Sequence, residues 1–401
     1  MRLGFASADL TPGPELSLLG YDWRQSDQPT GNAGVNDPLL CRSVCLRDGP
    51  TTVVLVALDL CIISVAWARR LRAAVAQSCG CPAEAVLISC SHTHSGPDPA
   101  EPEFTAQVAT VLPNARPGDD AHAAYRSRVE SVVVATAARA AALTVPVRVA
   151  ARSAPCGIAY GRRVVTTDSA GKEHVGLCWN PQEWPLLSPN PSVDPILSLL
   201  WFASDGLTRP VALWNLGAHP VVLGRTSRVV SADWPGAAAQ VIGGLTGADS
   251  LFTLGPCGDT HPWIATQADP RALSIIGTAA GGLVATLAGA AVTAADQRLG
   301  FARKTLTLGG HELDLAALRI GPARLVSAPV ELFAKLGADL RRQIPGPLLI
   351  STNTDGWTGY WPDADSFPGG GYEIDAARAM GRSPGDGEVL LAALVELAER
   401  V

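Results

Sequence analysis

Short apolar runs alternate with longer alanine-rich stretches along this chain. The apolar runs have the length of strands and are rich in Val, Leu and Ile. They predict strands at Thr52–Leu58, Val86–Ser89, Val147–Ala151, Leu197–Phe202, Val211–Asn215, Leu251–Leu254 and Leu348–Ser351. The alanine-rich stretches predict helices at Val65–Gln77, Asp120–Leu143, Pro235–Leu245, Pro270–Ala295 and Val330–Arg342. This alternation predicts an α/β fold with mixed β-sheets flanked by helices.

One of these stretches, Ala272 to Ala295, contains no charged residue and has the length of a membrane span. It consists mainly of Ala, Gly and Thr, which are weakly hydrophobic compared with the residues of a Leu-rich span. Asp269-Pro270 in front of it resembles a helix N-cap followed by proline at the first helical position. We therefore predict a buried helix packed through small residues, and no transmembrane segment.

The composition is that of a globular chain, because 47% of the 401 residues are hydrophobic and 17% are charged. No internal repeat or low-complexity linker divides the sequence, so we expect one domain over residues 1–401. A net charge of −6 provides no basic surface for nucleic acid, and no nucleic-acid partner is expected.

The start of the chain and its cysteines predict a cytoplasmic protein. Met1 leads into an apolar run without a signal-peptide pattern, so no signal peptide is expected. The nine cysteines are an odd number in a long chain, and we interpret them as reduced thiols. The Pro- and Asn-rich stretch Asn180–Asp194 predicts a long surface loop near the active site.

The most informative motif is Ser91-His92-Thr93-His94-Ser95-Gly96-Pro97, directly after the strand predicted at Val86–Ser89. In an extended chain alternate side chains share a face, so His92 and His94 are expected to project together. Gly96-Pro97 then ends the strand. Two imidazoles at a strand end suit a catalytic metal site. Hydrogen-bonded core histidines explain the pair, taken alone, equally well.

Other polar residues occupy comparable positions. His219 follows the strand predicted at Val211–Asn215, and His261 follows that at Leu251–Leu254. The turn Ser327-Ala328-Pro329 opens the helix predicted to carry Glu331. Sites in α/β proteins are commonly built at strand ends, so these positions favour a shared site. Spacing alone does not select the ligands.

Taken in order, a series of short motifs resembles the neutral/alkaline, non-lysosomal ceramidases, the zinc-dependent N-acylsphingosine amidohydrolases. The resemblance covers nearly the whole chain. It rests on Gly4 to Pro12, Gly20-Tyr21, Asn36 to Leu39 with Arg42, Val56 to Leu60, Ser91 to Pro97, Gly161 to Arg163, Val193 to Pro195, Ala218 to Pro220, Ser231 to Gly236, Gly258-Asp259 with Pro262, Ala328 to Glu331 and Gly371 to Glu373.

The resemblance implies a set of metal ligands and a catalytic histidine. His92 and His219 are similar to the family's histidine ligands, Glu331 to its carboxylate ligand and Tyr372 to its phenolate ligand, which together would hold one zinc ion per chain. His94 is similar to the histidine that manages the proton of the metal-bound water. The implied reaction is attack of a metal-bound hydroxide on an amide carbonyl.

Other matching positions imply supporting roles. Arg162 resembles the arginine near the substrate head group. Asp59, Asp233 and Asp259 are candidates for carboxylates around the metal centre that orient its ligands, since such groups fix a histidine tautomer. Capping or turn formation is the alternative role of these aspartates.

The chain also departs from the family. We expect it to have neither the signal sequence nor the C-terminal β domain of the secreted enzymes. His261 precedes Pro262 where ceramidases carry serine, and Ile374–Pro384 contains no tyrosine where the family has a further active-site tyrosine. We therefore take Tyr360 and His261 as candidates for contacting the substrate carbonyl in its place.

Three hypotheses of function follow. The first is a zinc-dependent amidohydrolase that cleaves the N-acyl bond of a small or amphipathic, lipid-like molecule. The second keeps the metal but acts as an ester or lactone hydrolase, or as an acyl transferase. The third is a non-catalytic descendant that binds a metal or ligand. Metallo-β-lactamase-like and barrel amidohydrolase patterns fit less well, since neither gives a role to Glu331 or Tyr372. The sequence leaves the acyl group, the amine, the identity of the divalent ion and the oligomeric state open.

Overall fold

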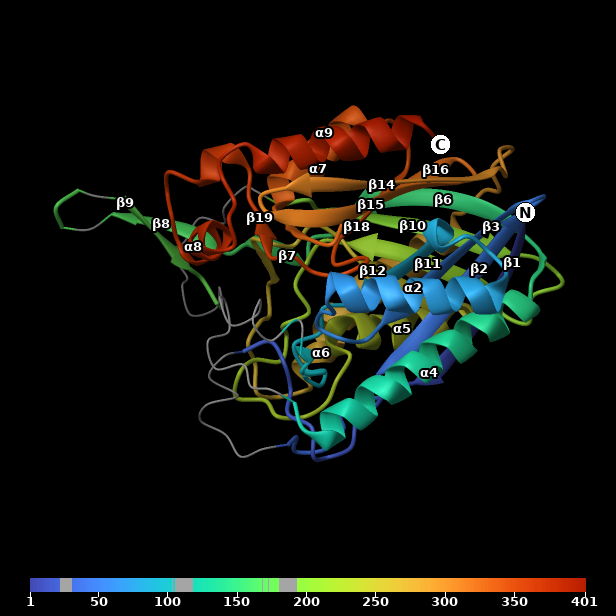
Figure 1. Ribbon diagram of the computed structural model, residues 1–401, viewed down its shortest axis with the longest axis horizontal. Coiled ribbons are helices and arrows are strands. Elements are labelled where there is room, and N and C mark those ends of the chain that lie inside the picture. The colour runs from blue at the N-terminus through green and yellow to red at the C-terminus, as the bar shows by residue number, and fades with distance from the viewer. Residues whose placement is uncertain (22–30, 103, 105–117, 168, 172, 180–192) are drawn as a thin grey trace.

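The computed structural model describes residues 1–401 except 22–30, 103, 105–117, 168, 172 and 180–192. Three sheets carry the fold (Figure 1). The first has the order β4 (Val86–Cys90), β3 (Thr51–Leu58), β2 (Leu40–Asp48), β1 (Arg2–Asp9) and β5 (Val145–Pro146). The second has the order β12 (Asp249–Leu254), β11 (Val211–Leu216), β10 (Ile196–Ala203) and β6 (Arg148–Pro155). The third has the order β14 (Leu299–Leu308), β15 (His311–Ile320), β16 (Ala323–Ser327) and β18 (Leu348–Ser351).

The central strands, such as β3 and β11, are buried on both faces because successive side chains enter different cores. On β3, Val53 and Leu55 enter a core shared by all three sheets, whereas Val54 and Val56 face the helices. The same alternation of period two occurs on β11, where Leu213 joins the shared core and Trp214 points the other way. Strands buried on both faces read as continuous apolar runs, which is why the sequence pattern predicted them.

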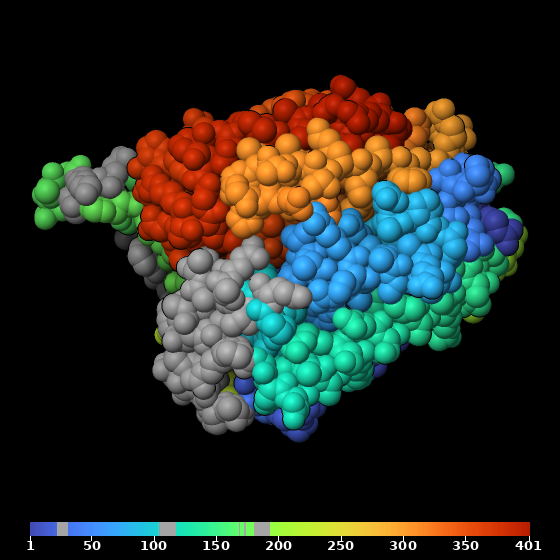
Figure 2. All heavy atoms as spheres, viewed as in Figure 1, coloured from blue at the N-terminus to red at the C-terminus, as the bar shows by residue number. Residues whose placement is uncertain are grey.

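Helices cover the outer faces of the sheets (Figure 1). They are α2 (Val65–Cys79) and α4 (Asp120–Ala142) on the first sheet, α5 (Asp233–Thr246) and α6 (Ala272–Gly289) on the second, and α7 (Ala334–Gln343) and α9 (Asp386–Glu399) on the third. The short helix α8 (Tyr372–Ala379) and the hairpin of β8 (Arg163–Thr167) and β9 (Glu173–Leu177) lie at one end of the molecule, where the hairpin projects from the body (Figures 1 and 2). With mixed sheets and flanking helices, the predicted α/β fold is confirmed.

Small residues allow α5 and α6 to approach closely. A Cβ added at Gly277 would lie 2.5 Å from the Cβ of Ala237, and one at Gly281 would lie 2.7 Å from the carbonyl oxygen of Ala238. By length and composition α6 is the one described helix that could cross a membrane, and 44% of it is buried. Leu273 and Ile276 of its inner face belong to the core of the second sheet.

Two substitutions on α6 should therefore have opposite effects. Gly277→Ala forces α5 and α6 apart, and we expect it to lower the free energy of unfolding by about 1–3 kcal/mol, the usual cost of overpacking. Gly282→Ala on the same helix meets nothing within 4 Å. It should raise stability by up to about 1 kcal/mol through helix propensity. Urea denaturation of both variants measures the difference, and equal stabilities would contradict the tight α5–α6 contact.

The parallel strand pairs determine where a site forms. β3 pairs in parallel with β4, β11 with β12, and β16 with β18. Their carboxyl ends are joined by backbone hydrogen bonds from Cys90 N to the Asn353 carbonyl and from Thr352 N to the Leu254 carbonyl. The segments that follow these strands therefore meet at one place, as is usual in α/β proteins.

Two local expectations near that place are wrong. Glu331 does not lie on a helix: it forms the two-residue strand β17 (Glu331–Leu332), which pairs with β19 (Tyr360–Trp361), and α7 begins only at Ala334. β4 ends at Cys90, so His92 and His94 are not on an extended strand. Most of the loop expected at 180–194 lies outside the described residues.

Candidate metal centre

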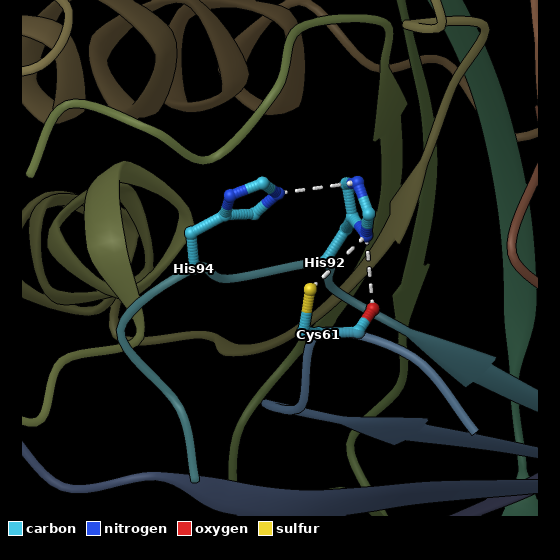
Figure 3. Close-up of side chains that lie close together, drawn as sticks. All are labelled: Cys61, His92 and His94. Atoms are coloured by element: carbon cyan, nitrogen blue, oxygen red, sulfur yellow. Dashed lines mark hydrogen bonds between the residues drawn. The ribbon is translucent and has the colours of Figure 1, made fainter. Parts of the chain in front are cut away.

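The loop after β4 places His92. Its backbone N–H donates to the carbonyl of Leu60, 2.9 Å away, and its φ of 69° puts it in the left-handed region. For a residue other than glycine this conformation costs roughly 1–3 kcal/mol and tends to occur at functional sites. His92 Nδ1 lies 3.0 Å from the carbonyl oxygen of Cys61 (Figure 3). A carbonyl can only accept, so Nδ1 carries the ring proton and Nε2 is left with its lone pair.

The turn after β11 places His219 in the same way. His219 Nδ1 lies 2.9 Å from the carbonyl oxygen of Thr260, on β13 (Thr260–Pro262). The indole N–H of Trp234 donates to the His219 carbonyl at 3.1 Å. The ring is therefore fixed in the tautomer that leaves its Nε2 unprotonated.

Glu331 supplies an oxygen to the same point. Its Oε2 lies 3.1 Å from His219 Nε2 and 3.6 Å from His92 Nε2. Its other oxygen, Oε1, accepts a hydrogen bond of 2.6 Å from the indole N–H of Trp357. All three side chains are almost fully buried. They form one of two groups of potential metal ligands among the described residues.

This arrangement fits a cation. Two imidazole lone pairs and one carboxylate oxygen face one another in a buried space, which is unfavourable unless a positive charge lies among them. Two nitrogens and an oxygen are also a donor set that zinc accepts, with room for further ligands. The residues present therefore fit the divalent ion that the sequence predicted, while the identity and number of ions stay predictions.

The pKa shifts of these three side chains indicate the charge of the centre when it binds protons and no metal ion. Burial would lower the pKa of His92, but the neighbouring Cys61 and Glu331 raise it well above its usual value. Burial and the charge of Arg162 lower the pKa of His219 to about 4. Burial would raise the pKa of Glu331, but His92 and His219 hold it well below its usual value. One proton thus neutralises the cluster, in the place where a metal ion would bind.

His94, Tyr360 and Tyr372 lie around the same centre. Together with His92 and Glu331 they line a cavity of about 40 Å³, enough for an ion and a water molecule. His94 Nε2 points at His92 Nε2 across 3.4 Å, as Figure 3 shows. Gly20 has a φ of 116°, and a Cβ there would lie 2.5 Å from the His94 ring. This explains the Gly20-Tyr21 motif, because the chain passes directly over the catalytic candidate.

Solved structures with the same fold carry informative names. A neutral ceramidase from Pseudomonas aeruginosa superposes with a TM-score of 0.79 and 16% identity, covering 100% of this chain and 75% of that one. A ceramidase complexed with C2 gives a TM-score of 0.79 and 15% identity, with the same coverage. The chain has a neutral ceramidase-like fold. No family model matches it, and no curated protein matches it in sequence.

Arg162 and His261 are not among the described residues that line the cavity beside His92 and His94. Arg162 is 3% exposed and donates to Glu373 Oε1, to His261 Nε2 and to the Gly258 carbonyl at 2.7–3.0 Å. It also donates to the Tyr360 hydroxyl, 3.3 Å away. Arg162 thus holds the Tyr360 hydroxyl in place. Contact of Arg162 with a substrate stays a prediction.

Their surroundings distinguish Tyr360 from His261 as the group that would donate a hydrogen bond to the substrate carbonyl. Burial and the charge of Arg162 lower the pKa of His261 well below its usual value, and the ring is not among the described side chains that line the cavity. Burial raises the pKa of Tyr360 well above its usual value, so its hydroxyl keeps its proton beside the cavity. The geometry favours Tyr360. Tyr372, which is 42% exposed, has its ring 5.8 Å from that of Tyr360, and its role as a ligand stays a prediction.

The three aspartates expected to orient the ligands contact other groups. Asp59 pairs with Arg42 at 2.8 Å, and Asp233 accepts backbone hydrogen bonds from Val222 and Leu223 in the loop after His219. Asp259 accepts from Ala334 N at the start of α7. The orienting acceptors of both histidines are backbone carbonyls, so the expectation of orienting carboxylates was wrong. Asp233 and Asp259 accept from backbone N–H groups, which agrees with the alternative of capping and turn formation, and Asp59 forms an ion pair that neither role describes.

Sequence analysis assigned no orienting role to Trp357, Cys61 or Glu373. Trp357 holds Glu331, Cys61 holds His92, and Glu373 pairs with Arg162 at 2.7 Å and with Arg163 at 2.9 Å. The charged residue beside an aromatic one in Tyr372-Glu373 was the sequence feature that could have indicated the ion pairs of Glu373. No sequence signal exists for the carbonyl of Cys61 or for that of Thr260.

Trp357 offers a test of the centre. Trp357→Phe keeps the ring but removes the N–H that fixes Glu331, and we expect zinc affinity to fall by about 10- to 100-fold, as for other groups that orient a metal ligand. Trp361→Phe is the matched control, because its indole N–H binds Thr358 Oγ1 and not a candidate ligand. Competition with a chromophoric chelator measures both affinities, and equal losses would contradict the role of Trp357.

Proposed function

We propose that this protein is a zinc-dependent amidohydrolase that cleaves the N-acyl bond of a small or amphipathic molecule. The observation that carries the proposal is the convergence of His92 Nε2, His219 Nε2 and Glu331 Oε2, with His94 Nε2 3.4 Å from the first of them. The similarity in fold to proteins named as ceramidases supports an amide as the bond cleaved.

Each side chain of the centre has a separate role in the proposed reaction. His92, His219 and Glu331 would hold the ion, with Tyr372 as a further ligand. A bound zinc ion would lower the pKa of a water molecule and polarise the substrate carbonyl. His94 Nε2 takes a proton from the attacking water and returns it to the leaving nitrogen. The Tyr360 hydroxyl donates a hydrogen bond to the carbonyl oxygen as negative charge develops there.

Zinc binding should strengthen as the pH rises. The pKa of His92 is raised well above its usual value in the metal-free cluster, so this cluster holds a proton at neutral pH. Zinc has to displace that proton, and its affinity should therefore increase by about tenfold per pH unit until the proton is lost. Zinc titrations at several pH values measure the slope, and an affinity independent of pH would contradict a protonated cluster.

Paired substrates test the proposed reaction. We would assay the protein on acyl amides and on esters with the same acyl group and the same leaving skeleton, before and after zinc removal by a chelator. Amide turnover that disappears on chelation and returns with zinc supports the proposal. Preference for the ester or lactone identifies the alternative hydrolase. One bound zinc without turnover on either series would leave the non-catalytic alternative.

A further inference from the structure

A second group of ligating side chains lies beside the His92 ring. In the part of the chain that the structure describes, one ligand atom each from Cys61, His92 and His94 lie within 4.8 Å of one another. Cys61 Sγ is 3.6 Å from His92 Nδ1, and His94 Nε2 is 3.4 Å from His92 Nε2. Figure 3 shows the Cys61 sulfur and the His94 ring both directed at His92.

The two distances belong to different nitrogens of the His92 ring, and one ion can bind only one of them. His92 Nδ1 donates to the Cys61 carbonyl, so the ion would bind His92 Nε2. The 3.4 Å from there to His94 Nε2 is the separation of two nitrogen ligands with bonds of about 2.0–2.1 Å at a tetrahedral ion, and the Cys61 side chain has to turn toward that ion to complete the site. The Cys61 thiol forms no disulfide. It lines the same cavity as both histidines.

We propose that Cys61, His92 and His94 form a second cation site, which prefers thiophilic divalent ions and competes with the His92–His219–Glu331 centre. The preference follows from the ligands, because this group has a sulfur in place of the carboxylate, and soft ions favour sulfur. As the metal–sulfur bond forms, the S–H bond breaks and its proton passes to solvent. No electron is transferred.

Competition follows from the chemistry of His92. A neutral imidazole has one ring proton and one lone pair. The Cys61 carbonyl holds the ring proton on Nδ1, so the thiophilic ion and the ion of the first centre both need Nε2, and the ring binds one of them at a time. An ion at the second site would also occupy His94. If the proposed function holds, such an ion removes a zinc ligand and the proton-transferring histidine together, and it inhibits the enzyme.

Cadmium is the probe, and its ultraviolet charge-transfer band with thiolate sulfur is the readout. Cys79 and Cys81 lie close to each other and could bind cadmium themselves, so the full-length chain carries Cys79→Ser and Cys81→Ser as background. We expect a band that saturates at one cadmium per chain. Adding Cys61→Ser should abolish it. Adding His94→Ala should weaken cadmium binding at least tenfold, and adding His219→Ala should leave the band in place.

Two results would overturn the proposal. One is a band of unchanged strength and affinity in the Cys61→Ser variant, with Cys61→Ala and circular dichroism as checks on folding. The other is a band that disappears with His219→Ala, since Cys61 would then belong to the first centre. The readout needs neither substrate nor zinc, so its failure is separate from failure of the proposed hydrolysis.

Discussion

His219→Ala is expected to abolish zinc binding and catalysis together. The substitution removes one of three buried ligand atoms and leaves Glu331 Oε2 without the nitrogen 3.1 Å away. The Lewis-acid contribution of a catalytic metal is several kcal/mol, and each 1.4 kcal/mol is tenfold in rate, so kcat should fall by about a thousandfold or more. Metal analysis of the purified variant should find far less than the zinc content of the wild type.

His311→Ala is the matched control for this experiment. His311 is half-buried, and its Nε2 lies 3.2 Å from the carbonyl oxygen of Met380, away from the proposed ligands. It should keep full zinc content and activity. Zinc should also raise the melting temperature of the wild type and of His311→Ala, because an ion that binds only the folded state stabilises it, but not that of His219→Ala. Full zinc content in His219→Ala would refute the assigned centre.

The sequence predicted much of the scaffold because its central strands are buried on both faces. The run Leu348–Ser351 matches its strand to the residue, and α2, α4 and α5 begin and end within two residues of the prediction. The helix predicted at Pro270–Ala295 ends at Gly289, and the one predicted at Val330–Arg342 begins at Ala334. The pattern failed where polar residues occur within strands. β14, with Arg303 and Lys304, and β15, with Glu312 and Asp314, are continuous ten-residue strands that the apolar pattern did not reveal. Organisation as one domain and localisation in the cytoplasm stay predictions.

The sequence indicated which side chains lie in the candidate site, but not the contacts that hold them in place. Histidines after strands and the resemblance in motifs pointed to His92, His94, His219 and Glu331. The structure places these side chains next to one another, and their roles stay predictions. The left-handed conformation of His92, the carbonyl acceptors behind the histidines, and Trp357 behind Glu331 depend on contacts between distant segments. Every residue has a backbone carbonyl, so the sequence gives no sign of which carbonyl will accept from a histidine. This is why sequence analysis assigned the orienting role to carboxylates and not to the carbonyls that perform it.

His94→Ala is expected to separate proton transfer from metal binding. Three ligand atoms of the centre are unchanged, so zinc content should equal that of the wild type, whereas kcat should fall by about 10²- to 10⁴-fold, the usual contribution of a general acid–base group. The limb of the pH–rate profile that reports this group should also disappear. A residue that only supports the loop would change stability without altering the shape of that profile.

Imidazole added to the assay provides the decisive comparison. The Ala variant leaves space where the His94 ring stood under Gly20, next to the cavity. A small base that enters this space can accept the proton in place of His94 Nε2, so imidazole should partly restore kcat in His94→Ala. It should not restore kcat in His219→Ala, in which the metal centre itself is incomplete. Rescue of neither variant, together with an unchanged pH profile, would assign His94 a purely structural role and require another proton acceptor.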